Sequence, residues 1–547
     1  MSDYLSINQE YSTSVAYFSM EYAIHQPLKI YSGGLGFLSG SHMRSAYDMK
    51  QNLVGVGMLW KYGYYDQARN EDLTMRVDYT VKYYTFLEDP GITVTVNVFG
   101  KDIYVKAFLL KPETFGSAPI YLLSTDLPEN DYLSKTITHH LYDPNEETRI
   151  AQSIVLGIGG GKVLDALNRH VDIYHINEAH ALPVAFHLYD VHKNWEEVKK
   201  HLVFTTHTPE KAGNESHNFD LLSRASFFGN VPMQDIHALD CIINGQFEYT
   251  LAALRMAKKA NGVSELHGEV SRNMWREYNN ICPIDHITNS QNVAYWADNS
   301  LLQAYHEQND NWIRVRKKEL KKQLFEVIAD QTGDMLDPNV LTIVWSRRFA
   351  GYKRPDLIMR DYNRFMNLLN NIHQPVQIIW AGKPYPRDQE AIGIFNKILQ
   401  STLTSDRSVI LVGYELGLSA LLKKGADVWL NNPRYTREAS GTSGMTASMN
   451  ATLNLSNLDG WVKEYGKHME NSFIMQHAVP NQNIDEQDNQ DAQYLYEILE
   501  NVVIPTYYND QQKWAQMIRK SMDDIFPFFN SDRMADEYYK KLYNSGR

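Results

Sequence analysis

The chain has 547 residues, of which 43% are hydrophobic and 22% charged, so it is long enough for two large globular cores. Its net charge of −12 argues against general nucleic-acid binding, which needs a basic surface, and no apolar run is long enough to cross a bilayer. The chain has two cysteines, Cys241 and Cys282, and so small a number argues against a disulfide framework. We therefore expect a cytoplasmic protein without a structural metal site.

Short β-branched and aromatic runs alternate with longer segments of helical period, which is typical of parallel α/β sheets. The strands predicted in the first half are 15–18, 54–58, 93–98, 103–109, 171–176 and 202–206. The third and fourth flank residues 99–102 and predict an antiparallel hairpin inserted into the sheet. The buried strands predicted in the second half are 341–345, 376–381, 409–413 and 428–430.

A charged helical stretch, residues 311–331, separates the two halves, and its basic run 314–322 (RVRKKELKK) is interpreted as a solvated helix face. We expect two doubly wound lobes and a helical C-terminus. The expected parts are an N-terminal Rossmann-like domain with an antiparallel insertion (1–320), a C-terminal Rossmann-like domain (321–515), and helices that pack back toward the first domain (516–547).

Two segments are rich in glycine. Residues 32–36 (SGGLG) precede a predicted helix, where glycines allow backbone N–H groups to approach an anion or a sugar oxygen, although the same pattern also forms plain tight turns. Residues 157–162 (GIGGGK) lack the spacing of a nucleotide-binding loop, and Val163 stands where Ser or Thr should bind magnesium. We interpret the second segment as a place of close helix packing.

Polar side chains follow two predicted strands at their carboxyl ends, where open α/β sheets bind ligands. Asn177, Glu178 and His180 come just after strand 171–176, and His207 follows strand 202–206. A single histidine in such a place is often a satisfied structural group, but two clusters on successive strands favour a functional site.

Four cations follow the buried strand 341–345: Arg347, Arg348, Lys353 and Arg354. Guanidinium groups bind phosphate oxygens bidentately, so we favour an anion site over a solvated face, with Lys383 as an additional cation.

Residues 438–450 (EASGTSGMTASMN) follow strand 428–430. Glu438 is suited to accept two sugar hydroxyls, and residues 440–444 to present backbone N–H groups to an anion at a helix start. Thr442 and Ser443 also suit a plain N-capped helix.

Several segments resemble, in the same order, those of the α-glucan phosphorylases, most closely the shorter bacterial branch. They are AYFSMEYAIHQPLKIYSGGLGFLSG, INEAHA, FTTHTP, NGVSELHGEVSRNMW, RRFAGYKRP, ADVWLNNP and EASGTSGM, and together they cover roughly residues 15–470. The resemblance implies the GT-B fold, with two facing Rossmann-like doubly wound domains and the active site in the cleft between them. It also implies a hexosyltransferase that phosphorolyses α-1,4-glucan reversibly to glucose 1-phosphate with retained configuration.

The resemblance further implies roles for individual residues. The catalytic residues would be His207 at the glucose ring, Arg348 and Lys353 at the phosphate, and Glu438 at the glucose hydroxyls. The substrate-binding residues would be Gly33, Gly34, Gly36, Asn177, Glu178, His180, Arg347, Ser440, Gly441 and Thr442. The expected partners are an α-glucan or oligosaccharide and phosphate or a sugar phosphate, without metal, nucleic acid or membrane. A homodimer is compatible, since family members are often dimers.

One position departs from the family. Most members carry pyridoxal phosphate on a lysine eight residues after the glutamate that Glu438 matches, and here that position is Thr446. A hydroxyl cannot form a Schiff base, no other lysine lies within 438–450, and Lys463 is expected to be too distant. Covalent attachment is therefore not expected, and the cofactor is left open.

Three hypotheses follow. The first is a phosphorylase-type enzyme that binds pyridoxal phosphate without a covalent link or uses another anion in its place. The second is a GT-B glycosyltransferase that needs no pyridoxal phosphate and accepts a nucleotide sugar. The third is a non-catalytic glucan-binding protein, against which the complete cation set and Glu438 argue.

Overall fold

The computed structural model describes residues 7–480 and 483–544 and divides them into two compact units. Unit 1 contains residues 7–65, 79–289 and 531–544, and unit 2 contains 66–78, 290–480 and 483–530. Residues 290–320, which the sequence placed in the first domain, therefore group with unit 2. The reason is apolar packing: Leu301 and Ala304 of α13 (Asn299–His306) form one buried cluster with residues of α14 (Asp310–Thr332) and with Met522.

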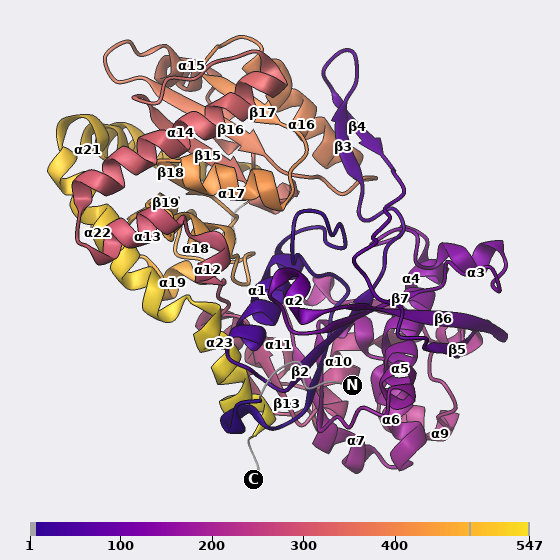
Figure 1. Ribbon diagram of the computed structural model, residues 1–547. Helices are drawn as coiled ribbons and strands as arrows, with labels where there is room; N and C mark the ends of the chain where they lie inside the picture. Colours follow the sequence, from indigo (N-terminus) through magenta and orange to yellow (C-terminus); the bar gives the residue numbers. More distant parts are fainter. Residues whose placement is uncertain (1–6, 481–482, 545–547) are drawn as a thin grey trace. The chain divides into compact units, whose positions relative to one another are not determined.

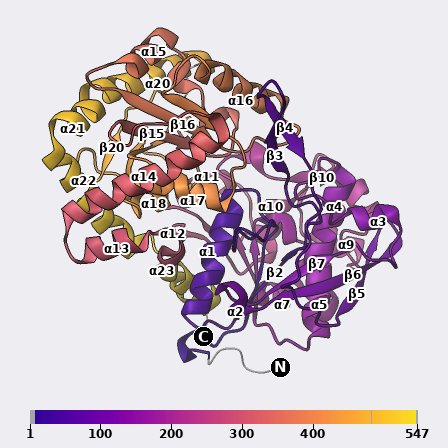
Figure 2. The same ribbon diagram turned by 45° about the horizontal axis from the view of Figure 1, so that its top comes forward.

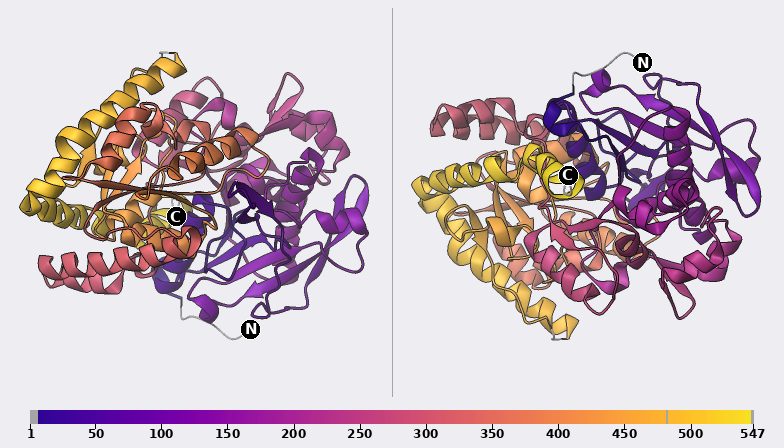
Figure 3. Two further views of the ribbon diagram at one scale, coloured as in Figure 1. Left: turned by 90° about the horizontal axis from the view of Figure 1, so that it is seen from above. Right: turned by 90° about the horizontal axis from the view of Figure 1, so that it is seen from below.

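The C-terminal segment is shared between the units. Helix α22 (Gln511–Phe528) belongs to unit 2, whereas α23 (Ser531–Glu537) and the helical turn η8 (Tyr538–Tyr543) belong to unit 1. Within unit 1, α23 packs on α1 (Gly34–Asp48), and the Ser531 and Ser45 hydroxyls hydrogen-bond to each other at 2.5 Å. Figure 3 shows the yellow helical segment, α20 (Ile484–Ile498) to α22, along the outside of unit 2.

Unit 1 is built on a nine-stranded sheet with the order β14-β13-β9-β8-β1-β2-β7-β6-β5 (Figure 1). Its strands are β1 (Val15–Phe18), β2 (Leu53–Met58), β5 (Thr93–Val98), β6 (Lys101–Leu110), β7 (Ile120–Ser124), β8 (Ile173–Asn177), β9 (Leu202–Thr205), β13 (Lys259–Gly262) and β14 (Ile284–His286). The strands from β14 to β7 are parallel, while β6 is antiparallel to β7 and to β5. The predicted hairpin is thus confirmed.

Unit 2 is built on a six-stranded parallel sheet with the order β17-β16-β15-β18-β19-β20. Its strands are β15 (Leu341–Ser346), β16 (Val376–Ala381), β17 (Ser408–Leu411), β18 (Val428–Asn431), β19 (Leu453–Ser456) and β20 (Ser472–Ile474). A short antiparallel hairpin, β3 (Asp66–Arg69) and β4 (Met75–Asp78), packs on α16 (Gln389–Thr402) of this unit (Figure 2).

Both sheets have the strand order of a Rossmann fold. Numbered along the chain, the parallel strands of unit 2 run 3-2-1-4-5-6, and those of unit 1 have the same order with one more strand at the edge. The order reverses between β1 and β8 in unit 1 and between β15 and β18 in unit 2. Ligands of such sheets bind outside the carboxyl ends of the strands at this reversal. The fold therefore identifies one candidate binding edge in each unit.

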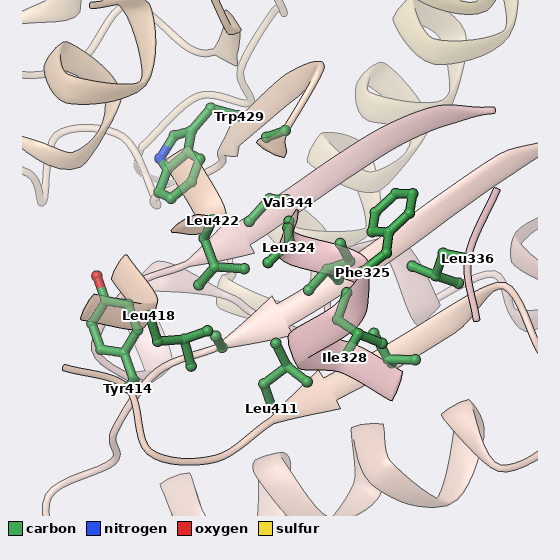
Figure 4. Packing of buried hydrophobic residues seen from close by; sticks show 14 of the residues in the cluster. Leu324, Phe325, Ile328, Leu336, Val344, Leu411, Tyr414, Leu418, Leu422 and Trp429 are labelled. Atoms are coloured by element: carbon green, nitrogen blue, oxygen red, sulfur yellow. The ribbon is translucent and has the colours of Figure 1, made fainter. Parts of the chain in front are cut away.

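Apolar side chains fix the helices of unit 2 to its sheet. Leu324 and Ile328 of α14 and Leu422 of α17 (Leu416–Gly425) pack with Val344 and Trp429 in one buried cluster (Figure 4). Burying each large apolar side chain contributes about 1.5–3 kcal/mol, and this holds α14 and α17 side by side.

The interpretation of residues 314–322 as a solvated face is wrong for two lysines. Lys317 and Lys321 are buried because α14 turns them toward the sheet. The Lys317 ammonium donates to Asn450 O at 2.7 Å and Thr452 Oγ1 at 2.6 Å, and Lys321 pairs with Asp427 at 2.5 Å.

The close-packing interpretation of residues 157–162 is confirmed. A Cβ on Gly157 would lie 2.6 Å from Val184 N, and one on Gly161 would lie 2.4 Å from His187 Cδ2. These glycines let the helical stretch from α4 (Glu146–Ile154) to α5 (Gly160–Ala166) touch α6 (Val184–His192). Among the described residues, no helix has both the length and the apolar character needed to span a membrane.

Candidate functional site: two Rossmann switch points

The glycine loop of unit 1 follows β1 and is held by a carboxylate that the sequence analysis did not single out. Buried Glu21 accepts hydrogen bonds from Ser32 N at 2.6 Å, Gly33 N at 3.1 Å and the Tyr142 hydroxyl at 2.7 Å. Two backbone N–H groups of the loop are thus satisfied by the protein itself. The clue in the sequence was an acidic residue three positions after the strand that begins the sheet.

The three loop glycines have different surroundings. A Cβ on Gly33 or Gly34 would meet no atom within 4 Å, so both face open space at the start of α1. A Cβ on Gly36 would lie 2.7 Å from both Glu21 Oε2 and Tyr31 Cβ, so Gly36 is needed for packing. That Gly33 and Gly34 line a ligand pocket stays a prediction.

Asn177 and His207 are brought together at the reversal point of unit 1. His207 Nε2 lies 2.7 Å from Asn177 Oδ1, and Asn177 Nδ2 donates to Ser39 Oγ at 3.1 Å. Ser39 Oγ in turn donates to Leu35 O at 2.9 Å, which fixes the direction of the Asn177 amide. Because an amide oxygen only accepts, His207 carries its proton on Nε2 and presents the lone pair of Nδ1. Burial, with the neighbouring His267 and His180, lowers the pKa of His207 to about 3, so it is a neutral acceptor.

Glu178 has a strained backbone, with φ 65° and ψ 167°, a region that side chains other than glycine rarely adopt. Its carboxylate accepts hydrogen bonds from His207 N and from Thr208 Oγ1, the second at 3.3 Å. Burial raises the pKa of Glu178. These hydrogen bonds to the Glu178 carboxylate hold the loop after β9. His180 lies nearby with its ring beside Tyr142, and its Nδ1 finds no hydrogen-bond partner within residues 7–480 and 483–544.

In unit 2, Arg347 follows β15 and Glu438 follows β18, so the two flank its reversal point. Arg347 Nη2 donates to Glu438 Oε2 at 2.7 Å, and Lys353 Nζ lies 3.3 Å from the same oxygen. Burial alone raises the pKa of Glu438, but the charges of Arg347 and Lys353 outweigh it and hold the pKa at about 2. Arg347 Nη1 is buried and has no hydrogen-bond partner in the described part of the chain. A buried donor of this kind is costly unless a ligand satisfies it.

The other predicted cations lie elsewhere. Arg348, next to Arg347 in the chain, has an exposed side chain. Arg354 is a structural group: it donates to Asn432 O at 3.0 Å and pairs with Asp491 at 2.5 Å, which ties the loop to α20. Lys383 is buried with its Nζ 3.5 Å from Glu415 Oε1. The structure therefore joins Arg347 and Lys353 to Glu438, whereas the resemblance had assigned the phosphate to Arg348 and Lys353.

The loop after Glu438 is compact. Gly441 has φ 75°, and a Cβ there would lie 3.2 Å from Arg347 Nη2 and 3.4 Å from Glu438 Oε1. Ser440 Oγ bonds to Gly441 O at 3.2 Å, and Thr442 precedes α18 (Ser443–Ser448) without capping it through its side chain. Gly441 is therefore needed both for its backbone conformation and to leave room for the ion pair.

Asp459, which follows β19, is a functional candidate that the sequence analysis missed. It is buried, and its carboxylate accepts from Glu438 N at 3.1 Å and Gly460 N at 2.9 Å. Burial raises its pKa to about 7, aided by the Glu438 carboxylate and opposed by these amides and Arg347. The signal in the sequence was the Asp-Gly pair alone, since strand β19 before it was not predicted, and many such pairs are plain turns.

The residue at position 446 does not fit a covalently bound pyridoxal phosphate. Thr446 has no exposed surface, and its hydroxyl donates to Ser443 O at 3.0 Å inside α18. Lys353 is paired with Glu438, and the side chain of Lys463 is exposed. No reaction step is therefore derived through this cofactor. Among the described residues, no group of three or more His, Cys, Asp or Glu side chains is arranged to hold a metal ion.

The chain has two Rossmann-like units. One has an open glycine loop beside an acceptor histidine, and the other has a buried arginine–carboxylate cluster. Together these features define the class of α/β transferases that handle sugars and anions. A carbohydrate phosphorylase family model matches residues 291–502. A maltodextrin phosphorylase of Thermococcus litoralis is 32% identical over 97% of this chain and 70% of its own length. A glycogen phosphorylase of Aquifex aeolicus is 32% identical over the whole chain and 88% of its own length.

An uncharacterised protein of Methanocaldococcus jannaschii is 46% identical over 96% of this chain and 99% of its own length. The chain belongs to the carbohydrate phosphorylase family, whose fold is GT-B. The predicted membership among the α-glucan phosphorylases and glycosyltransferases is confirmed.

Proposed function

We propose that this chain catalyses reversible, retaining glycosyl transfer between an α-1,4-glucan and phosphate, which yields glucose 1-phosphate. The observation that carries the proposal is the buried Arg347: its Nη2 is paired with Glu438, while its Nη1 has no hydrogen-bond partner among the described residues. A phosphate oxygen, like a carboxylate oxygen, is a strong hydrogen-bond partner for a guanidinium group. The names of the relatives, maltodextrin and glycogen phosphorylases, supply the glucan.

In this reaction the bond between glucose C1 and the glucan oxygen breaks, and a bond between C1 and a phosphate oxygen forms. The proton of the phosphate passes to the leaving glucan oxygen, so that no other reactant is needed. Arg347 and Lys353 fix the position and charge of the phosphate, which stabilises the positive charge that develops on the glucose ring.

Two acceptors suit the sugar. Glu438 is ionised because its pKa is about 2, and His207 is neutral with Nδ1 as an acceptor, so each can accept a hydrogen bond from a hydroxyl group. Neither group is prepared to act as the acid at neutral pH. We therefore assign the acid role to the phosphate itself.

The test is the release of glucose 1-phosphate from maltodextrin with and without inorganic phosphate, with the anomeric configuration read by NMR. We expect release that requires phosphate and gives the α-anomer. The double variant Arg347→Met with Glu438→Gln removes both partners of the ion pair and leaves Lys353, whose side chain is 11% exposed, as the remaining cation. We expect at least a tenfold higher KM for phosphate. Arg314→Met, at an exposed position that bonds within α14, is the matched control.

Two outcomes would overturn the proposal. Glucosyl transfer from ADP-glucose or UDP-glucose without phosphate would identify a nucleotide-sugar glycosyltransferase instead. Maltodextrin binding without turnover of any of these donors would identify a glucan-binding protein.

The cofactor is tested separately. The protein is incubated with pyridoxal phosphate, reduced with borohydride and mapped by peptide mass spectrometry. We expect no added mass on the peptide that contains residues 438–450, because Thr446 has no amine. Activity with and without added pyridoxal phosphate then shows whether the unlinked cofactor contributes.

A further inference from the structure

Asp459 lies beside the Glu438 loop but is not one of the groups proposed to touch the substrate. It follows β19, the strand next to β18 in the sheet, and its side chain is 1% exposed. Its two carboxylate oxygens have separate partners: Oδ2 accepts from Glu438 N at 3.1 Å and Oδ1 from Gly460 N at 2.9 Å. A single carboxylate thus links the turn after β19 to the backbone of Glu438.

Gly460 makes the same connection by close contact. It has φ 57°, and a Cβ at this position would lie 2.7 Å from Ser440 O and 3.0 Å from Ser440 Cα. The turn at Asp459 and Gly460 therefore packs directly against residues 438–440. Any other residue at position 460 would force the two segments apart, because the atoms it would meet belong to the Ser440 backbone.

The start of the Glu438 loop is held from several directions. Glu438 N donates to Asp459, Arg437 N bonds back to Arg434 O at 2.9 Å, and the Glu438 side chain reaches Arg347 and Lys353. Displacement of the Glu438 backbone would move the carboxylate that aligns both cations. A shift of about 1 Å at a charged group of this kind is enough to reduce a reaction rate about a hundredfold.

The charges around Asp459 are consistent with a positioning role. Glu438 repels its carboxylate and Arg347 attracts it, while the two backbone N–H groups stabilise the ionised form. Within the described part of the chain, the Asp459 carboxylate hydrogen-bonds to Glu438 N and Gly460 N, so it acts on the cations through Glu438.

We propose that Asp459 is a positioning residue that holds the backbone of Glu438, and through it Arg347 and Lys353, in the geometry that binds phosphate and glucose. The inference rests on the proposed function for its effect on substrates. The hydrogen bond from Glu438 N is a property of the fold and is tested independently of turnover.

The first measurement is hydrogen–deuterium exchange of the full-length protein, resolved over residues 438–441. Asp459→Ala removes the acceptor, and we expect at least tenfold faster exchange in this segment, with the rest of unit 2 unchanged. Asp459→Asn keeps one acceptor oxygen, and we expect an intermediate rate. Equal exchange in the wild type and Asp459→Ala would overturn the proposal.

The double variant Asp427→Asn with Lys321→Met is the matched control, because Lys321→Met removes the ammonium that would otherwise be left buried and unpaired. Asp427 is also buried and accepts a backbone hydrogen bond, from Thr342 N at 2.9 Å, but it precedes β18, whereas Glu438 follows this strand. We expect this double variant to speed exchange at Thr342 and to leave residues 438–441 unchanged. Acceleration over 438–441 in the control as well would mean general loosening of unit 2 and would contradict a specific role.

The second measurement is kinetic and uses each variant below its unfolding temperature. We expect Asp459→Ala to raise KM for phosphate and for maltodextrin at least tenfold, with Asp459→Asn between it and the wild type. If the wild type lacks phosphorolysis, the proposed function fails, and isothermal titration with inorganic phosphate replaces the KM comparison. Unchanged KM and unchanged phosphate affinity in a folded Asp459→Ala protein would both contradict the proposal.

Discussion

Asn177 Oδ1 lies 2.7 Å from His207 Nε2, and this contact decides which nitrogen of His207 carries the proton. The wild-type pKa of His207 is about 3 because of burial. Asn177→Asp places a carboxylate in contact with the ring, which stabilises the imidazolium and should raise the pKa by about 1–3. Titration of ¹⁵N-labelled histidine by NMR, with His207→Asn to assign the signal, measures this change. A His207 signal that titrates between pH 6 and 7 in the wild type would contradict the assignment.

Alanine substitutions at Gly441 and Gly393 should change the stability of the protein in opposite directions. Gly441→Ala forces a side chain into a left-handed backbone and places its Cβ 3.2 Å from Arg347 Nη2, so we expect a loss of about 1–3 kcal/mol in the free energy of unfolding. Gly393 lies inside α16, and a Cβ there would meet nothing within 4 Å. Gly393→Ala should therefore stabilise the protein by about 0.5–1 kcal/mol. Urea unfolding of the two variants measures both effects, and equal effects would refute the argument.

Lys317 makes stability depend on pH in a defined window. Burial lowers its pKa to about 7, partly offset by the charges of Asp427 and Asp298 and aided by Lys321. The unfolded chain keeps the proton up to about pH 10.4, the usual pKa of lysine. Between these values the unfolded state binds more protons, so the free energy of unfolding should rise with pH, by at most about 1.4 kcal/mol per pH unit.

Lys317→Met should reduce this rise but not abolish it, because burial also lowers the pKa of Lys423. Lys318→Met should preserve the rise, since Lys318 lies next to Lys317 on α14 with an exposed side chain. Urea unfolding at pH 7, 8 and 9 compares the three proteins. Identical pH dependence of the wild type and Lys317→Met would show that Lys317 is not responsible.

The Lys321–Asp427 pair gives a second test of the buried lysines. Both side chains are buried and 2.5 Å apart. Asp427→Leu leaves an unpaired ammonium and should cost about 3–5 kcal/mol of unfolding free energy. Adding Lys321→Met removes that charge and should restore most of the loss. Thermal unfolding of the two single variants and the double variant measures the coupling, and additive losses would contradict it.

Much of the fold could be predicted from local patterns. The strands 15–18, 93–98 and 376–381 agree with β1, β5 and β16 because each is a bounded run of β-branched or aromatic residues. Strands β13 and β20 were missed, since KANG and SFI are too short and too mixed to stand out from loops. Residues 290–320 were assigned to the wrong unit because the packing of α13 on α14 and α22 is invisible in the sequence.

The candidate site, like the fold, could be predicted only in part. The cations after β15 and the glutamate after β18 were predicted because strand ends are recognisable in sequence, and Thr446 was recognised from its spacing to Glu438. Which cation meets Glu438 was not predictable, because Arg347 and Arg348 differ only in the direction that the chain turns after β15. Glu21 and Asp459 were missed because the contacts that give them a role, with Ser32 N and with Glu438 N, join residues 11 and 21 positions apart.

Residue order was therefore enough to establish the family, the two α/β lobes and the absence of an amine at position 446. The folded chain was needed to see that Arg347 pairs with Glu438, that Glu438 N donates a hydrogen bond to Asp459, and that Lys317 and Lys321 are buried. The physical reason is that hydrogen bonding and desolvation depend on distances of a few ångströms between segments far apart in the chain, which no local pattern encodes.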